Sequence, residues 1–474
     1  MDESRLFQGL KIVYFFTLLV TPVTLMTRIL FARVMTVEDY GLFYAFIGFF
    51  SLAYLLVVFG LDTGLTHYMP KLLAEKKHGL VKKTVAQIFL FQTGFATIVL
   101  IAIYLFRVPI AGAYFHTERS LVILPVFLVV LCLNIVFDLI IAFFRGANDE
   151  VMYASANPIR LLVVLALSFI VCFFMQGDVL FNLAIVWAAS FLLLFVYLGA
   201  AIYKYPKLFC SKLPQENFFR KIFRYGSFVV LSGGASFLLT QIDVVMITFF
   251  LGVKMTGLYQ IALPLATIVL VFIQPMASFL FPMVSKLHHT SRSKSVDYLL
   301  GAAYNLGFFI LLPVSVIMIV FAPTIIYLMF GAEYSLATYC ARILAAGFVL
   351  KGMAILNFAV LDGIGMVVRK TKLFYFGAFL NIVLNILFIM WLGIEGAAIA
   401  TTLTFGTMFI LSVVSIRSKG HVIRFNNWPK IIFSNVLLML VMMLLERILF
   451  LNVYIESMII LGAGAIVYLS LGYF

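Results

Sequence analysis

Residues 38–59, EDYGLFYAFIGFFSLAYLLVVF, begin with two acidic residues and continue into an uncharged run of 22 residues, 40–61. A membrane-crossing helix needs about 20 mainly apolar residues, so this run is long enough to be one. Similar runs recur along the whole chain, which has 474 residues, 64% of them hydrophobic and 11% charged. A soluble domain carries about 25% charged residues. We therefore predict a polytopic helical membrane protein, which excludes a soluble enzyme, a disordered chain and a collagen-like chain.

The apolar runs predict an all-α fold of about fourteen transmembrane helices. Residues 1–203 are predicted to form a six-helix lobe, 204–224 a basic linker, 225–416 a second six-helix lobe, and 430–472 two additional helices. The predicted spans are 10–35, 41–67, 82–106, 120–144, 152–175, 179–203, 225–251, 256–283, 298–322, 336–361, 373–392, 396–416, 430–448 and 453–472.

The basic residues of the loops predict the orientation. If the N-terminus is cytoplasmic, the inner segments hold 24 of the 33 lysine and arginine residues and the outer segments hold 5. By the positive-inside rule, both termini are then cytoplasmic in a multi-pass protein of the cell membrane. This distribution accounts for the net charge of +14 without a nucleic-acid partner. The four scattered cysteines show neither zinc spacing nor a disulfide pattern, and no cofactor is expected.

Two glycine turns recur at nearly one offset. Gly41 is followed by Gly257, 216 positions later, and Gly146 is followed by Gly363, 217 positions later. Two homologous halves of six spans would enter the bilayer in the same direction, which places a pseudo-two-fold axis along the membrane normal. The alternative is that glycine turns recur by chance in a helical membrane protein.

Several short motifs resemble those of one transporter family in order and spacing. The first half carries Ala32-Arg33 and Val37-Glu38-Asp39-Tyr40-Gly41-Leu42. The second half carries Gln241-Ile242-Asp243, Gly257-Leu258-Tyr259, Phe330-Gly331-Ala332-Glu333-Tyr334, Asn381, Asn385 and Gly393-Ile394-Glu395-Gly396-Ala397-Ala398. Over nearly the whole chain, the sequence resembles the polysaccharide biosynthesis flippases. Their superfamily also holds the MATE drug exporters and the lipid II flippases.

This resemblance implies a two-lobed bundle with a central cavity. Such a protein moves a polyprenyl- or dolichyl-phosphate-linked glycan across the membrane. The sequence departs from the lipid II branch in one respect, because the predicted eighth span at 256–283 has no basic residue. The broader glycan branch is therefore the better match.

Basic residues inside spans are candidates for binding the anionic lipid-linked substrate. A charge at the centre of a membrane helix costs at least about 2.5–3.5 kcal/mol, so it faces a cavity, a partner or the interface. We predict that Arg28, Arg160 and Lys351 bind substrate, since guanidinium and ammonium groups pair with phosphate oxygens. A structural ion pair is the alternative for Lys351. Arg342 lies on the opposite helix face from Lys351 and is predicted to reach the interface.

Three acids are candidates for gating or for coupling to H⁺ or Na⁺, namely Asp62, Asp138 and Asp243. Protonatable carboxylates in a cavity commonly couple transport to an ion gradient. Proximity to the cytoplasmic interface also explains Asp62 and Asp138. The repeat offset places Arg28 opposite Asp243, which predicts a gate pair that closes the outer side. The alternative is that each residue pairs within its own lobe or reaches the interface.

Helix-breaking residues occur in three spans. Pro22 lies in span one, residues 232–236 (SGGAS) lie in span seven, and Pro264, Pro275 and Pro282 lie in span eight. A break leaves backbone groups without their hydrogen bonds within the helix, and a membrane protein tolerates this where protein or water bonds them instead. We therefore expect these spans to line the cavity and bend. Helix packing through the glycines is the alternative.

Together these features predict a flippase for lipid-linked oligosaccharides that works by alternating access and is not an enzyme. Its partners would be the lipid-linked glycan, membrane lipids and glycan-assembly enzymes. A MATE-type exporter of cationic drugs is one alternative, but it would favour a cavity dominated by acids. A membrane glycan polymerase or glycosyltransferase is a second alternative. It would need a long outer loop or a soluble domain, and the predicted outer connections are short.

Overall fold

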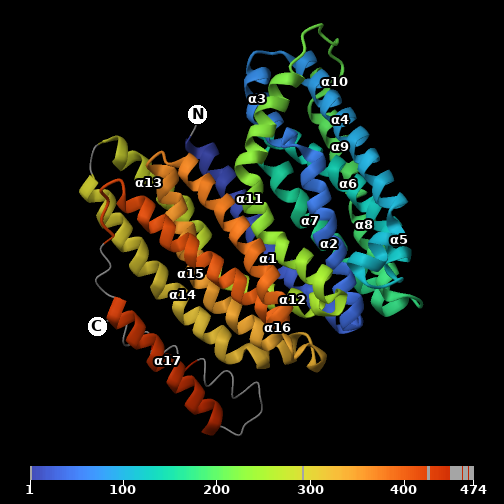
Figure 1. Ribbon diagram of the computed structural model, residues 1–474. Helices are drawn as coiled ribbons and strands as arrows, with labels where there is room; N and C mark the ends of the chain where they lie inside the picture. The colour runs from blue at the N-terminus through green and yellow to red at the C-terminus, as the bar shows by residue number, and fades with distance from the viewer. Residues whose placement is uncertain (1–2, 291–292, 424–427, 449–461, 463–467, 469–474) are drawn as a thin grey trace. The chain divides into compact units, whose positions relative to one another are not determined.

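The computed structural model describes residues 3–290, 293–423 and 428–448, together with Gly462 and Tyr468 (Figure 1). Every regular element in these residues is a helix. Eleven of the described helices are long and apolar enough to cross a membrane. The prediction of an all-α polytopic membrane protein is confirmed.

The chain divides into two compact units. Unit 1 comprises Met1–Gln241 and Gly252–Lys254, and unit 2 comprises Ile242–Leu251 and Met255–Phe474. The division falls inside the long helix α11 (Phe219–Leu251), whereas the sequence predicts the boundary between the lobes in the basic linker at 204–224. Each unit is described separately below.

Unit 1 is built around aromatic side chains. Phe43 packs edge-on against Phe31 and Phe127, with ring centroids 5.2 and 5.5 Å apart, and all three rings are buried. Because lipid is as apolar as these side chains, close van der Waals packing is what holds the helices together. The helices are α1 (Glu3–Val34), α2 (Val37–Val58), α3 (Leu61–Ala74), α4 (His78–Leu105), α5 (Arg107–Ile110), a π-helical turn (Ala111–Phe115), α6 (Ser120–Gly146), α7 (Glu150–Phe174), α8 (Val179–Ser190), α9 (Leu193–Lys204), α10 (Pro206–Phe209) and the first part of α11 (Phe219–Leu251).

The packing of α11 on α3 explains why unit 1 extends beyond the linker. The backbone of Gly226 in α11 lies against the backbone of Gly60, directly before α3. One turn earlier in α11, Ile222 lies against Gly64. A Cβ atom on Gly60 or Gly226 would collide with the other residue, so the missing side chains allow the close approach.

Unit 2 is centred on α15, which packs against α13, α14 and α16. Gly347 of α15 lies against Thr402 of α16, where again a side chain would not fit. The helices are the last part of α11 (Ile242–Leu251), α12 (Val253–Thr267, in unit 2 from Met255 onward), a 3-10 turn (Ile268–Leu270), α13 (Ile273–His289), α14 (Ser293–Met329), a second 3-10 turn (Ala332–Tyr334), α15 (Ala337–Gly363), α16 (Val367–Arg417) and α17 (Trp428–Ile448).

The helix bounds repeat with the offset that the glycine turns predict. α2 begins at Val37 and α12 begins at Val253, 216 positions later. α6 and α15 each contain 27 residues and end at Gly146 and Gly363, 217 positions apart. α2 and α12 therefore start at equivalent residues, and α6 and α15 stop at equivalent residues, as expected of two homologous halves.

The second predicted span, 41–67, is wrong as a single helix. α2 ends at Val58 and α3 begins at Leu61. Between them, Phe59 and Gly60 adopt left-handed backbone conformations with φ angles of 49° and 66°. This break is where α11 approaches, a contact between residues far apart in the sequence.

The predicted helix breaks are found in one of the three spans. The eighth span is interrupted, because α12 ends at Thr267 and α13 begins at Ile273. α1 continues through Pro22, and α11 continues through residues 232–236, so the bending of these two spans during transport stays a prediction. A membrane helix can continue through a proline when neighbouring groups satisfy the carbonyl that loses its hydrogen bond. A glycine still has its N–H group, so it does not remove a hydrogen bond from the helix.

The last predicted span, 453–472, lies outside the described residues except for Gly462 and Tyr468. The Tyr468 hydroxyl donates a 2.7 Å hydrogen bond to the backbone carbonyl of Phe309 in α14. α17 also packs on α14, and Met442 lies in a buried cluster with Phe321 and Tyr468. Both α17 and Tyr468 therefore contact α14.

Candidate functional site

A buried carboxylate lies at the centre of the polar cluster of unit 2. Asp243 of α11 is 4% exposed. Its Oδ1 accepts a 2.8 Å hydrogen bond from the amide of Asn385. Its Oδ2 accepts hydrogen bonds from the hydroxyl groups of Thr401, at 2.5 Å, and Tyr259, at 2.8 Å. A charge in an apolar environment is costly unless it is paired or hydrogen-bonded, and here three neutral donors meet that need.

The shape of α16 brings the partners of Asp243 together. Asn381 and Asn385 are four residues apart and so share one face of the helix, and the Asn385 amide donates to the Asn381 carbonyl at 3.0 Å. The amide of Asn381 also lies 3.4 Å from the hydroxyl of Thr401. In a straight helix, residues 20 apart would be separated by about 30 Å. Gly393, with φ 64° and ψ −136°, folds α16 back on itself and joins the two predicted spans 373–392 and 396–416 into one bent element.

This cluster is suited to a small monovalent cation or a proton. It contains one carboxylate among neutral oxygens, and Oδ1 of Asn385 is buried without a hydrogen-bond partner among the described residues. Hard cations prefer carboxylate, carbonyl and water oxygens. The described residues contain no group of three or more His, Cys, Asp or Glu side chains that could hold a metal ion. The donor set therefore favours an alkali ion or a proton over a transition metal.

Lys351 of α15 lies between two aromatic rings of the same unit. Its Nζ atom is 4.6 Å from the ring centroids of both Phe348 and Phe405. Asp243 acts on it electrostatically, but Lys351 forms no ion pair within the described part of the chain. The structural ion pair considered from the sequence is therefore absent there. Cation–π contacts hold the ammonium group and leave its donors available to an anion.

Asp62 and Asp138 belong to one polar cluster in unit 1. The fully buried Gln92 of α4 donates a 3.0 Å hydrogen bond to Oδ1 of Asp62. The hydroxyl of Tyr54, on α2, interacts with both carboxyl groups. Both acids are half-buried, so they lie inside the helix bundle of unit 1.

Arg160 of α7 lies beside the same cluster. Its guanidinium carbon is 4.4 Å from the ring centroid of Phe191 and 5.2 Å from that of Trp187. One terminal nitrogen donates a 3.4 Å hydrogen bond to Ser190, and Asp138 acts on the group electrostatically. The Nε atom is buried without a hydrogen-bond partner among the described residues. The structure thus joins three residues that the sequence treated separately, namely Asp62, Asp138 and Arg160.

Arg28 of α1 contacts two tyrosines of unit 1. Its guanidinium carbon lies 4.3 Å from the ring centroid of Tyr44, and its side chain hydrogen-bonds with Tyr40. The predicted gate pair of Arg28 with Asp243 stays a prediction. Arg342 donates a 2.9 Å hydrogen bond to the backbone carbonyl of Ile319, which gives this guanidinium a protein partner within unit 2.

Sequence reasoning missed most partners of the acids. Asn381 and Asn385 belong to the motifs that carry the resemblance, and their spacing of four residues signals a shared helix face. Thr401 and Gln92 had weaker signals, since each is an uncharged polar residue next to other uncharged polar residues, Thr402 and Thr93, in a mainly apolar segment. Their roles follow from contacts between helices that sequence spacing does not reveal.

Comparison with known proteins gives a consistent result. Residues 6–288 match the family described as polysaccharide biosynthesis protein. The chain is 30% identical over 414 residues to an uncharacterized membrane protein, MJ1068, of Methanocaldococcus jannaschii, which covers 83% of this chain and 80% of the relative. It is 27% identical over 235 residues to the probable low-salt glycan biosynthesis flippase Agl15 of Haloferax volcanii, which covers 48% of this chain and 49% of that protein.

The fold also matches a solved transporter. The lipid II flippase MurJ, in an inward closed conformation, superposes with a TM-score of 0.76 at 16% sequence identity. The match covers 97% of each chain. At this identity the likeness concerns the fold.

Proposed function

Because the chain belongs to the polysaccharide biosynthesis protein family, we propose that it is a flippase that moves a lipid-linked oligosaccharide across the membrane by alternating access. The carrier would be a polyprenyl or dolichyl phosphate or pyrophosphate. The relative named as a glycan biosynthesis flippase and the fold shared with a lipid II flippase support this proposal. Its partners would be the substrate, the surrounding lipids and glycan-assembly enzymes, in a cell membrane with both termini cytoplasmic.

The observation that carries the proposal is the environment of Lys351. An ammonium group in the middle of a membrane span has a free-energy cost that other groups must offset. Two phenylalanine rings stabilise this one, without an ion pair in the described residues. Such a group keeps its hydrogen-bond donors for a ligand. Phosphate oxygens are the anionic acceptors that a lipid-linked oligosaccharide offers.

Arg28 and Arg160 are the other proposed phosphate contacts. Each guanidinium group lies near aromatic rings, which hold it in place while its flat face is shielded from lipid. Guanidinium binds phosphate through two parallel hydrogen bonds, whereas ammonium acts as a point charge. The three cations would therefore bind the same group with different geometries.

We further propose that Asp243, with Asn381, Asn385 and Thr401, binds the ion that couples transport to a gradient of H⁺ or Na⁺. A single carboxylate among amide and hydroxyl oxygens matches a singly charged ion. Rotation of the Asn385 amide would present its unpartnered oxygen to such an ion. Asp62 and Asp138, which share Tyr54, are the second candidate for coupling and provide a proton site in unit 1.

Reconstitution tests the proposed function. The full chain in proteoliposomes should move a fluorescent polyprenyl-pyrophosphate-linked oligosaccharide between leaflets, measured as loss of accessibility to a membrane-impermeant quencher. Protein-free liposomes are the control. Transport of a cationic dye without transport of the lipid-linked glycan would contradict the proposal and favour a MATE-type exporter. A new glycosidic bond in the product would instead indicate an enzyme.

A further inference from the structure

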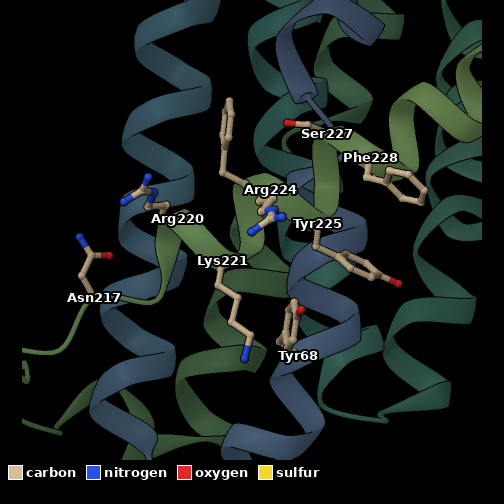
Figure 2. Close-up of a pocket in the computed structure, with 9 residues that line it drawn as sticks. Tyr68, Asn217, Arg220, Lys221, Arg224, Tyr225, Ser227 and Phe228 are labelled. Atoms are coloured by element: carbon tan, nitrogen blue, oxygen red, sulfur yellow. The ribbon is translucent and has the colours of Figure 1, made fainter.

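A pocket outside the sites described so far opens where α3 meets the start of α11. It has a volume of about 1130 Å³, and all of its lining residues belong to unit 1 (Figure 2). Three of them are basic, Arg220, Lys221 and Arg224, and all three side chains are exposed. The flippase mechanism proposed above does not use this pocket.

The charge of the pocket selects anions. No acidic residue is among the described residues that line it. Glu75 is the acid that acts on Lys221, but it pairs with Lys77 at 2.9 Å and with Lys71 at 3.9 Å. The hydrogen bond from Lys77, together with the more distant Lys71 and Lys221, lowers the pKa of the Glu75 carboxyl. Because Glu75 is held by these other lysines, the pocket keeps its positive charge.

The walls of the pocket are aromatic. Tyr68 of α3 and Tyr225 of α11 lie with their ring centroids 5.4 Å apart, and Nζ of Lys221 is 5.2 Å from the Tyr68 ring. His67 stacks on Tyr225 at 4.4 Å, which fixes the orientation of that ring. Ser227 also lines the pocket, but its Oγ atom is buried and has no hydrogen-bond partner among the described residues. Aromatic rings pack well on the C–H faces of sugar rings.

Two lysines of α4 hold the linker segment next to the pocket, which ends at the lining residue Asn217. Nζ of Lys82 donates a 2.5 Å hydrogen bond to the carbonyl of Phe209. Nζ of Lys83 donates to the carbonyls of Pro214, Gln215 and Glu216, at 2.9, 3.1 and 3.0 Å. These bonds tie the chain directly before Asn217 to α4. The linker residue that lines the pocket, Asn217, is therefore held in place before a ligand arrives, which lowers the entropic cost of binding.

We propose that this pocket binds the phosphorylated sugar head of the lipid-linked oligosaccharide before it enters the transport pathway. The inference rests on the proposed function and deepens it, because it assigns a separate loading site on the side predicted to be cytoplasmic. The arginines and the lysine bind the phosphate or pyrophosphate. Tyr68 and Tyr225 bind the first sugar.

Binding to the full chain in nanodiscs tests the proposal. The probe is a fluorescent short-chain polyprenyl pyrophosphate that carries one hexose. The variant Arg220→Gln/Lys221→Gln/Arg224→Gln should weaken binding at least about tenfold and raise the transport KM by a similar factor, with the maximal rate within about twofold. The matched control is Lys207→Gln/Lys212→Gln/Lys419→Gln, which removes the same charge from exposed residues outside the pocket and should bind normally. Arg220→Lys/Arg224→Lys keeps the charge and should recover part of the affinity.

The outcomes separate the two proposals. If the wild-type protein neither binds nor moves the probe, the proposed function fails. If the wild-type protein transports and the two triple variants bind equally, the loading site fails. Inorganic pyrophosphate that binds as tightly as the probe would overturn the sugar contact and leave an anion site. Complete competition by phosphatidylglycerol in the nanodisc would identify a phospholipid site instead. Equal amounts of folded protein in size-exclusion chromatography are required before the variants are compared.

Discussion

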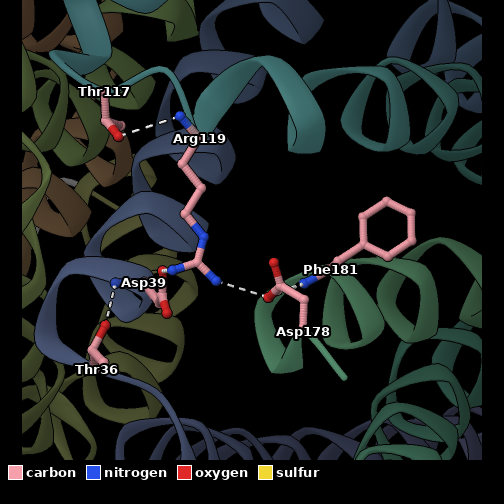
Figure 3. A network of polar contacts seen from close by, with 6 residues as sticks. All are labelled: Thr36, Asp39, Thr117, Arg119, Asp178 and Phe181. Carbon is pink, nitrogen blue, oxygen red and sulfur yellow. Dashed lines mark hydrogen bonds and ion pairs between the residues drawn. The ribbon is translucent and has the colours of Figure 1, made fainter. Parts of the chain in front are cut away.

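Arg119 donates a 2.6 Å charge-assisted hydrogen bond to Asp39, which joins the start of α6 to the start of α2 (Figure 3). The same guanidinium group contacts Asp178, which caps α8, at 2.8 Å. These residues belong to three loops that the sequence placed on one side of the membrane. Their meeting agrees with the predicted direction of the spans in unit 1. This agreement holds whichever side of the membrane these three loops face.

Removal of this ion pair should loosen one end of unit 1. Arg119→Ala leaves Asp39, whose side chain is 12% exposed, without its cation. Because Arg119 itself is 44% exposed, we expect a loss of about 1 kcal/mol in the free energy of unfolding. Thermal stability in detergent, followed by fluorescence-detected size exclusion, measures the effect. Arg107→Ala, which removes an arginine stacked on Tyr104, is the control and should change stability less. Equal shifts for the two variants would show that the ion pair contributes no more than the stacking of Arg107 on Tyr104.

The orientation can be tested by labelling single cysteines. The 24-to-5 distribution of basic residues predicts that Lys212→Cys is labelled from the cytoplasm and Glu118→Cys from outside. Both positions are exposed in the structure. Cys210 is also exposed and should first be replaced by serine. Labelling of the Lys212 site in intact cells by an impermeant maleimide would reverse the predicted topology.

Lys351→Ala should strongly reduce transport while the protein still reaches the membrane. A hydrogen bond to a charged group contributes about 1.5–3 kcal/mol, so we expect a loss of about 10- to 100-fold in kcat/KM. Lys351→Arg should keep partial activity, since the charge remains while the geometry changes. Complementation of a flippase-deficient strain, with membrane quantities measured by immunoblot, gives the readout. Normal transport by Lys351→Ala would leave this lysine with a structural role.

Asp243→Asn should uncouple transport from the ion gradient. The substitution keeps the size of the side chain and removes its charge, so exchange without a gradient should continue while stimulation by Na⁺ or H⁺ is lost. Thr401→Val removes one hydroxyl donor from the same carboxylate and should weaken the apparent ion affinity. Asp297→Asn, at an acid that pairs with His421 outside this cluster, is the control. If Asp62→Asn abolishes the stimulation and Asp243→Asn does not, the coupling site lies in unit 1.

The sequence predicted the helices better than their breaks. Apolar length and the repeat offset fix where a helix can lie, and the equivalent ends at Gly146 and Gly363 follow from these local signals. The break at Phe59–Gly60 depends on Gly226, a residue of a different helix. Local sequence cannot reveal such a contact, because the glycine that allows it looks the same in a continuous helix.

The same distinction applies to the candidate sites. Asp243 and Lys351 could be selected from the sequence, because a charge in an apolar run is conspicuous. Their environments could not be predicted: the donors to Asp243 include Asn385 and Thr401, which lie on either side of the bend at Gly393. Asp62 and Arg160 were selected separately, and only tertiary packing places them in one cluster. Single candidate residues can thus be identified from the sequence, whereas the way they come together in a site depends on contacts between helices.

The two glycines in the middle of α11 offer a test of whether this helix bends during transport. α11 is continuous at these residues. A Cβ atom added to Gly233 would have no neighbour within 4 Å, and one added to Gly234 would lie 3.9 Å from the side chain of Val230. Packing therefore does not require glycine at these positions. Gly226 in the same helix is different, since its backbone lies against Gly60.

Gly233→Ala/Gly234→Ala should therefore keep or raise stability, because alanine favours a helix by about 0.8–1.0 kcal/mol per residue over glycine. If α11 must bend between transport states, the same double variant should slow transport several-fold without changing the substrate affinity. Gly226→Ala is the matched control and should lower thermal stability, because its new methyl group collides with the Gly60 backbone. The measurements are thermal unfolding in detergent and the rate of glycan transport in proteoliposomes. A stabilised double variant that transports at the wild-type rate would show that α11 moves as a rigid helix and that the hinge lies elsewhere, with the interruption between α12 and α13 as the next position to test.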